Sequence, residues 1–283
     1  MTFGITGVTG EFGGYAVQHM IDMGVKPADI VGLARSKEKA ADLIDKGVTI
    51  RLGDYDEPDT LKAAFKGVDR LLLVSGSEIG KRSEQHRNVI QAAGDVGVLH
   101  IVYTSITKAD RSPSPMAPEH RDTEAALASS GLSWTILRNN WYTENYQPSL
   151  AGARESGVIS AAIQHGRVAS ALKTEFAEAA ARTLLHPPDG EQIYELAGPA
   201  WTYQELAEAA GKALGTTVKY QPVSKEQRIK DLQAAGMPGD MAGFFAEVDA
   251  SIDEGALDIE SDDLPNILGR PVTGLSTALA SFS

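Results

Sequence analysis

Near its start the chain reads Ile5-Thr6-Gly7-Val8-Thr9-Gly10-Glu11-Phe12-Gly13-Gly14, a glycine-rich stretch between an apolar run and a helix-like one. In a turn from a strand into a helix, Gly7 permits a tight bend, Gly10 lets the backbone approach a pyrophosphate, and Gly13 allows close helix–strand packing. The following helix directs its N–H groups and positive dipole end at the phosphates. A glycine-rich hairpin is the alternative. The residues of the turn that we expect to bind a dinucleotide are Gly7, Thr9, Gly10, Glu11, Phe12 and Gly13.

The sequence after this turn alternates short apolar runs with longer amphipathic ones. The runs that we expect to form strands are residues 2–6, 29–34, 49–52, 70–75, 100–105 and 133–137. The stretches that we expect to form helices are residues 13–23, 37–46, 58–65, 81–96 and 119–129. Alternating strands and helices are most easily joined by right-handed crossovers, which place the helices on both faces of a parallel sheet. We therefore predict an α/β fold of the Rossmann type, with a doubly wound parallel sheet.

The alternation changes after Asn145. Helix-like residues 173–185 and 202–214 flank a strand candidate at 192–196, and this half should form a smaller α/β lobe, part of which completes the sheet. We place the NAD(P)-binding domain at residues 1–150 and the substrate-binding lobe at 151–283. The acidic residues 249–263 lack the spacing of a calcium loop, so we expect a solvated face and no metal.

Composition excludes several classes of function. The chain has 283 residues, 42% of them hydrophobic, and a net charge of −12, so it is globular and a poor match for a nucleic-acid partner. It has no cysteine, which rules out disulfides, thiolate nucleophiles and cysteine-bound zinc or iron–sulfur clusters. No targeting segment or membrane span is visible, and we expect a cytoplasmic protein without membrane partners. The oligomeric state does not follow from the sequence.

The end of the second predicted strand bears on the choice of cofactor. An NAD site usually has Asp or Glu there to bind the ribose 2′-OH, but this chain has Arg35, with Lys39 shortly after. A guanidinium suits a 2′-phosphate, so we expect NADPH, with NADH possible but weaker. Solvated charges at a helix start are the alternative. Asp54, after the third strand, should lie near the adenine or cap a loop.

The chemistry should lie at the carboxyl ends of the strands. Ser75 and Gly76 should border the nicotinamide ribose, and the predicted cofactor set also includes Ser77 and Ser105. The acceptor should then meet residues that follow the fifth and sixth strands. These catalytic candidates are Tyr103, His120, Asn139, Trp141 and Tyr142. Trp141 and Tyr142 offer flat walls for a planar acceptor, and packing in the core is the alternative role for them.

The source of a proton is open. No tyrosine has a lysine four residues later, so the usual relay of short-chain dehydrogenases is missing. An acceptor that becomes an anion after hydride transfer still needs stabilisation or a proton donor. Tyr103, His120, Asn139, Tyr142 and solvent can provide it, and His120 is chemically the most versatile because histidine titrates near neutral pH.

Several stretches together resemble one family. TGVTGEFGG, GDYDEP, LLLVSGSEIGKRSEQHRNVIQAA, IVYTS, EHRDTE and LRNNWYTENY are similar to NmrA-like atypical short-chain dehydrogenases, most closely the type 2 NAD(P)H:quinone oxidoreductases. The resemblance implies NADPH-dependent reduction of quinones without a flavin, in a pocket between two lobes. His120 stands where many relatives have a lysine close to the nicotinamide.

Two other functions stay open. One is a regulator that senses the dinucleotide without turnover, as NmrA-like folds can be, and the missing tyrosine–lysine pair favours it. The other is a reductase of a different carbonyl, imine or dye substrate.

Overall fold

A computed structural model describes residues 1–282 of the chain, which divides into two compact units. The first unit consists of Met1–Ala109, Pro118–Asn139 and Thr174–Tyr194. The second consists of Asp110–Ala117, Asn140–Lys173 and the chain from Glu195 on. Each unit is thus assembled from segments that are distant in sequence. The assignment of cofactor binding to residues 1–150 and acceptor binding to 151–283 stays a prediction.

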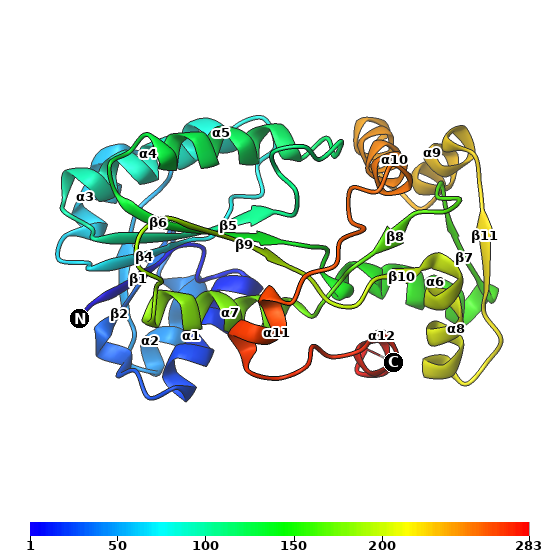
Figure 1. Ribbon diagram of the computed structural model, residues 1–283, viewed down its shortest axis with the longest axis horizontal. Helices are drawn as coiled ribbons and strands as arrows, with labels where there is room; N and C mark the ends of the chain where they lie inside the picture. The colour runs from blue at the N-terminus through cyan, green and yellow to red at the C-terminus, as the bar shows by residue number, and fades with distance from the viewer. Residues whose placement is uncertain (283) are drawn as a thin grey trace. The chain divides into compact units, whose positions relative to one another are not determined.

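One seven-stranded sheet, in the order β3-β2-β1-β4-β5-β6-β9, organises the first unit (Figure 1). Its strands are β1 (Phe3–Ile5), β2 (Ile30–Ala34), β3 (Thr49–Leu52), β4 (Arg70–Leu73), β5 (His100–Ile106), β6 (Ser133–Asn139) and β9 (Gln192–Leu196). All five pairings among β1 to β6 are parallel. The predicted strands and the Rossmann-type topology are confirmed.

Helices cover both faces of this sheet (Figure 1). On one face lie α1 (Glu11–Asp22), α2 (Ala41–Asp45) and α7 (Lys173–Leu185), and on the other α3 (Pro58–Phe65), α4 (Arg82–Asp95) and α5 (Ala117–Ala128). Because both faces are covered, the inner strands are rich in apolar residues, and β1, β2 and β5 are buried along their whole length, including the polar side chains of β5. The helix predicted over 37–46 is split into a 3-10 turn, Glu38–Ala40, and the short α2.

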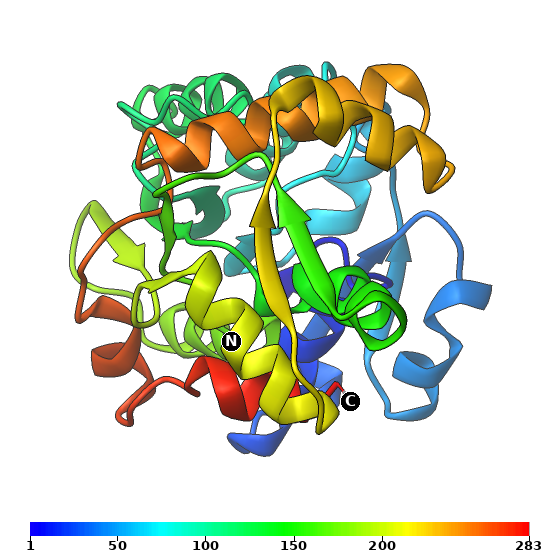
Figure 2. The ribbon, with the colours of Figure 1, turned by 90° about the vertical axis from the view of Figure 1, so that its right-hand side faces the viewer.

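The second unit is a smaller α/β assembly. Strand β8 (Arg167–Val168) pairs antiparallel with β10 (Trp201–Thr202), and β7 (Val158–Ala161) lies parallel beside β11 (Lys219–Pro222), as Figure 2 shows. Its helices are α6 (Gln147–Ser156), α8 (Tyr203–Leu214), α9 (Lys225–Ala234), α10 (Gly239–Asp253), α11 (Asp263–Leu268) and α12 (Leu275–Ala280). The second unit also has a 3-10 turn at Thr143–Tyr146, and the first unit has one at Pro27–Asp29 in addition to the turn before α2.

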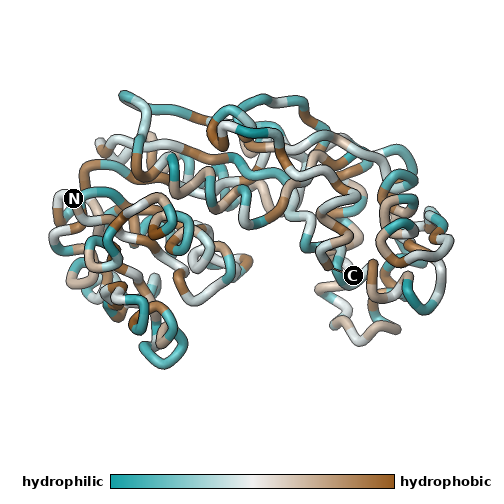
Figure 3. Tube along the Cα trace, turned by 90° about the horizontal axis from the view of Figure 1, so that it is seen from below, coloured by the Kyte–Doolittle hydropathy of each residue, from teal (hydrophilic) through white to brown (hydrophobic). Residues whose placement is uncertain are grey.

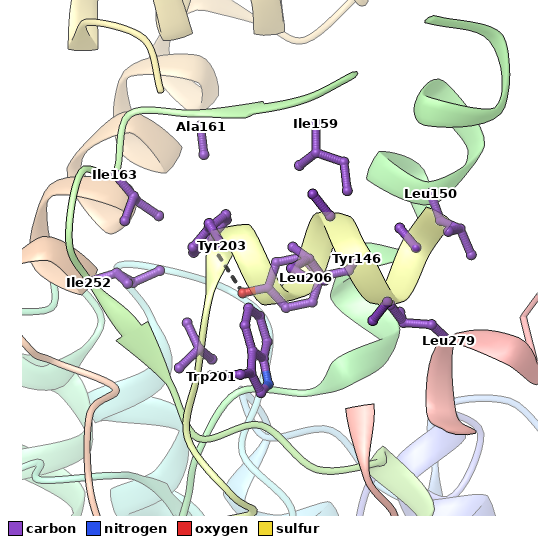
Figure 4. Close-up of a cluster of buried hydrophobic side chains, with 14 of the residues drawn as sticks. Tyr146, Leu150, Ile159, Ala161, Ile163, Trp201, Tyr203, Leu206, Ile252 and Leu279 are labelled. Carbon is purple, nitrogen blue, oxygen red and sulfur yellow. Dashed lines mark hydrogen bonds between the residues drawn. The ribbon is translucent and has the colours of Figure 1, made fainter. Parts of the chain in front are cut away.

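An aromatic cluster forms the centre of the second unit's core (Figure 4). Tyr146 and Trp201 pack edge to face with ring centroids 5.1 Å apart, and the Tyr146 hydroxyl lies 3.1 Å from that of Tyr203. The shared bond satisfies two hydroxyls that burial would otherwise leave unpaired. Apolar and polar residues alternate along the trace of both units, as elements with one buried face require (Figure 3). Among residues 1–282, no helix is both long and apolar enough to cross a bilayer.

The acidic segment from 249 to 263 differs from expectation. Asp249 is 7% exposed, and its carboxylate accepts hydrogen bonds from the N–H of Ala162 and from Nε of Arg228, both at 3.0 Å. Asp253, one helical turn later, accepts the backbone N–H groups of residues 164–166. The prediction of a solvated face is wrong for Asp249, whereas Asp253 is exposed as expected, and both carboxylates fix the connection from β7 to β8.

Candidate functional site

The predicted cofactor residues of the first unit gather at one edge of the sheet. Parallel strands end at the same edge of the sheet. From β1 the strand order runs to β2 and β3 on one side, and from its neighbour β4 it runs to β5 and β6 on the other. This is the switch point at which open α/β sheets bind ligands. The residues that follow or end successive strands there are Gly7 (β1), Arg35 (β2), Asp54 (β3), Ser75 (β4), Ser105 (β5) and Asn139 (β6).

The glycine turn has the geometry that a phosphate requires. Gly7 has φ of +62°, and its carbonyl oxygen accepts the N–H of Gly10 at 3.0 Å. A Cβ on Gly13 would lie 2.4 Å from that oxygen, so only glycine lets α1 start this close to β1. Gly10 caps α1 without a side chain, which leaves the helix terminus accessible to an anion. The other predicted residues of the turn are Thr9 and Glu11, which are exposed, and Phe12, which is buried.

Exposed positive charge follows β2. The side chain of Arg35 is 72% exposed, and its Nη1 lies 3.6 Å from Oε1 of Glu78, which also pairs with Lys81 at 3.3 Å. Lys39 is exposed as well. An exposed ion pair of this length holds its partners weakly, so Arg35 can turn to another anion.

Asp54 organises the loop after β3. Its Oδ1 accepts the N–H of Asp56 at 3.1 Å, and its own N–H donates to Oγ1 of Thr60 at 3.0 Å. These bonds form a local turn before α3, which is the loop-capping role that the sequence left open. Contact with an adenine stays a prediction.

A buried tyrosine–histidine pair joins the middle of β5 to α5. The Tyr103 hydroxyl is 2.7 Å from Nδ1 of His120, on α5, and the two side chains are 0% and 7% exposed. Burial raises the pKa of Tyr103 above its usual value. Burial, with help from Arg82 and His86, holds the pKa of His120 well below its usual value. Both groups are therefore neutral near pH 7, and Nε2 is the ring nitrogen that remains for a ligand.

Ser105 belongs to a buried polar group that the sequence did not reveal. Its hydroxyl donates to Oε1 of Glu124 at 2.6 Å, and Arg138 grips the same carboxylate through Nε at 3.0 Å and Nη2 at 2.7 Å. The Glu124 and Arg138 side chains are 11% and 10% exposed, and the paired geometry stabilises both buried charges. The group ties β5, α5 and β6 together beside the pair of Tyr103 and His120.

Asn139 has a buried carboxamide without partners. The residue is 4% exposed, and neither Oδ1 nor Nδ2 has a hydrogen-bond partner within residues 1–282. Burying an unpaired amide is costly, and native proteins rarely do so without a ligand or water to pair with it. The buried donor and acceptor at the end of β6 therefore need a bound water or another molecule to pair with them.

Trp141 and Tyr142 belong to the second unit. Trp141 is half-buried and packs against that unit's core cluster. Its backbone N–H donates to Oδ1 of Asn140 at 2.8 Å. Nζ of Lys173 lies 5.5 Å from the centre of the Tyr142 ring. Their role as walls for an acceptor stays a prediction.

The structure also identifies two buried residues and one partly buried residue around the predicted Gly76 that sequence reasoning missed. Arg82 and His86 bond to the Gly76 peptide, and Glu119 bonds to Arg82. The signal was present in the sequence, because Arg82 and His86 are polar residues on the core-facing side of an amphipathic helix, in line with Val89 and Ala93.

Comparison with known proteins identifies the family. The model of a family described as NAD(P)H-binding matches residues 7–179, well over half of the chain. The chain belongs to this NAD(P)H-binding family. Among curated proteins, quinone oxidoreductase 2 of Escherichia coli is 40% identical to it over 277 residues, which are 98% of this chain and 96% of that protein.

Solved structures agree with the family assignment. The NADPH-dependent quinone oxidoreductase of Escherichia coli complexed with NADPH has a TM-score of 0.96 and 40% identity, with 99% of each chain covered. The Citrobacter sp. triphenylmethane reductase complexed with NADP(H) has a TM-score of 0.96 and 36% identity, with 100% of each chain covered. The resemblance to quinone oxidoreductases and the predicted fold are confirmed.

Proposed function

We propose that this chain is an NADPH-dependent oxidoreductase that passes hydride directly to a quinone or a similar small planar acceptor, without a flavin. The observation that carries the proposal is a glycine turn with the backbone geometry of a phosphate site at the ligand edge of one parallel sheet, an edge at which the strand that ends with Asn139 also ends. The near full-length similarity to quinone oxidoreductase 2 supports the choice of acceptor.

The first unit fits the proposed cofactor. The backbone of the turn at Gly7 and the N-terminus of α1 would hold the pyrophosphate, and Arg35 would bind the 2′-phosphate. Ser75 and Gly76, in the loop after β4, would border the nicotinamide ribose, and Ser77 and Ser105 complete the proposed cofactor set. NADPH, when bound, supplies the hydride, and NADH would serve less well because it offers Arg35 no phosphate.

His120 would stabilise the reduced acceptor. In the tautomer in which the Tyr103 hydroxyl donates to Nδ1, Nε2 carries the ring proton and can donate a hydrogen bond to the acceptor's oxygen. A neutral imidazole in a buried site stabilises developing negative charge without becoming an acid itself. Solvent would then supply the proton that completes the hydroquinone. Asn139 would bind the acceptor or the nicotinamide amide, and the role of Trp141 and Tyr142 as flat walls stays a prediction from the sequence.

A reductase of another planar substrate is the second candidate, favoured by the 36% identity to triphenylmethane reductase. A regulator that senses the dinucleotide without turnover is the third outcome that an experiment must separate. The small-molecule acceptor is common to both enzymatic alternatives. The cytoplasmic location and the absence of nucleic-acid and membrane partners stay predictions.

A substrate panel tests the proposal. The purified chain would be mixed with NADPH and several quinones, a triphenylmethane dye and an azo dye, and the absorbance of the reduced nicotinamide followed. We expect consumption with quinones. Turnover of dyes alone would favour the second candidate, while different affinities for NADPH and NADP⁺ without any turnover would favour the regulator.

A further inference from the structure

The loop after β4 is fixed where it leaves the sheet by side chains of the flanking strands. The N–H of Val74 donates to Oγ1 of Thr6, next to β1, and the N–H of Ser75 donates to Oγ1 of Thr104, on β5, both at 2.9 Å. These hydroxyls take the backbone donors that no strand partner satisfies. The loop therefore has a defined path up to Ser75.

The next residue, Gly76, is held by α4 through both of its backbone polar groups. The N–H of Gly76 donates to Nε2 of His86 at 3.0 Å, and the carbonyl of Gly76 accepts from Nε of Arg82 at 2.8 Å. Because Nε2 accepts, Nδ1 carries the ring proton and donates to Oγ1 of Thr123 at 2.9 Å. Burial, with help from Arg82, lowers the pKa of His86 to about 3, so the ring stays a neutral acceptor.

The Arg82 side chain is itself held in place by Glu119, on α5. Oε2 of Glu119 lies 3.2 Å from Nη1 of Arg82, and the two side chains are 17% and 7% exposed. Oε1 of Glu119 accepts the N–H of Gly80 at 3.0 Å and that of Arg82 at 3.1 Å. One carboxylate thus fixes both the guanidinium of Arg82 and the backbone at the start of α4. The donor that bonds to the Gly76 carbonyl is therefore held in position.

We propose that His86, Arg82 and Glu119, which we call the Gly76 clamp, are positioning residues that hold the loop of Ser75 to Ser77 in the conformation that receives the nicotinamide end of NADPH. The inference rests on the proposed function, since it requires a dinucleotide at this edge. The clamp touches neither the 2′-phosphate site at Arg35 nor the glycine turn. It should therefore affect one end of the cofactor only.

Binding of a cofactor fragment tests the clamp directly. Dissociation constants would be measured by calorimetry for NADPH and for 2′-phospho-ADP-ribose, which lacks the nicotinamide. His86→Phe keeps a ring but leaves the Gly76 N–H without an acceptor, and we expect it to weaken NADPH by about tenfold or more. The fragment should bind nearly as it does to the unaltered chain. His86→Gln, whose amide oxygen can accept the same N–H, should restore most of the affinity for NADPH.

A second histidine provides the matched control. His100, on β5, is also buried, lies 2.9 Å from a threonine hydroxyl and has its pKa lowered by burial, yet it makes no bond to the loop. His100→Phe should leave the ratio of the two dissociation constants unchanged. Arg82→Lys, which keeps the charge opposite Glu119 but loses the Nε donor, should repeat the selective loss if His86→Phe does not fold.

The inference would be overturned if His86→Phe and Arg82→Lys weakened the binding of NADPH and of the fragment equally. It would also be overturned if His100→Phe weakened NADPH binding as selectively as His86→Phe does. Neither result depends on turnover. Failure of the proposed function is a separate outcome, namely an unaltered chain that binds NADPH and reduces no acceptor.

Discussion

Replacing Arg35 with Ala should change the cofactor preference of the chain. The 2′-phosphate is the only group that distinguishes NADPH from NADH, and Arg35 is the first cation after β2, where that group is expected. The variant should therefore bind NADPH more weakly and NADH nearly as before. Its fold should be unaffected, because the side chain is 72% exposed and its one ion pair is long.

The magnitude follows from the exposure of the site. A hydrogen bond to a charged group contributes about 1.5–3 kcal/mol, and solvent around Arg35 places the gain at the low end. Freeing the guanidinium from Glu78, 3.6 Å away, costs about 0.2–1 kcal/mol. With a gain of about 1.5–2 kcal/mol, the net loss in Arg35→Ala is about 0.5–1.8 kcal/mol, or roughly 2- to 20-fold in the dissociation constant for NADPH.

Titration calorimetry with both cofactors provides the assay. Lys46→Ala is the control, because Lys46 is also exposed and its ammonium group bonds to the Gln18 side chain, away from the end of β2. Glu78→Gln gives the converse test: without the competing carboxylate, NADPH should bind about two- to fivefold more tightly and NADH unchanged. If Arg35→Ala lowered the binding affinity for NADPH and for NADH by the same factor, the reasoning would be refuted.

Three further outcomes follow from the same geometry. Gly13→Ala should lower the free energy of unfolding by about 1–3 kcal/mol in thermal or urea unfolding, because its Cβ would lie 2.4 Å from a carbonyl oxygen of the turn, whereas Gly14→Ala should be tolerated. His120→Phe should lower kcat about 100-fold and Tyr103→Phe about tenfold, with little change in the dissociation constant for NADPH; losses confined to binding would contradict the role of the pair. His86 has a folded-state pKa of about 3 against an ordinary 6.5, so the unfolded chain binds more protons between these values and stability falls as the pH falls through this window. Urea titrations should show His86→Phe with a slope smaller by about 1.4 kcal/mol per pH unit there, and an unchanged slope would contradict the burial argument.

Local patterns were sufficient to predict the sheet of the first unit. Its strands are short apolar runs between amphipathic stretches, and the parallel arrangement follows from the crossovers that join them. The three glycines of the turn were predictable because each relieves a specific backbone constraint, as the 2.4 Å approach at Gly13 shows.

The polar groups that complete the site depend on contacts between distant residues, which one sequence does not display. Glu124 and Arg138 lie on different elements and meet only after β5, α5 and β6 pack together. Asp249 was expected in solvent because its neighbours are acidic, but the fold brings Arg228 and the Ala162 N–H to it. Polar residues on the core-facing side of a helix, such as His86, are the one signal of this kind that a sequence provides.

The central claim is direct hydride transfer from NADPH to a quinone, and the stoichiometry of a single reaction tests it most directly. The purified chain, without added flavin, would be mixed anaerobically with a limiting amount of NADPH and an excess of quinone, and both products measured. The account predicts that NADP⁺ and hydroquinone appear in equal amounts. Tight binding of NADPH without loss of its reduced-nicotinamide absorbance would contradict it.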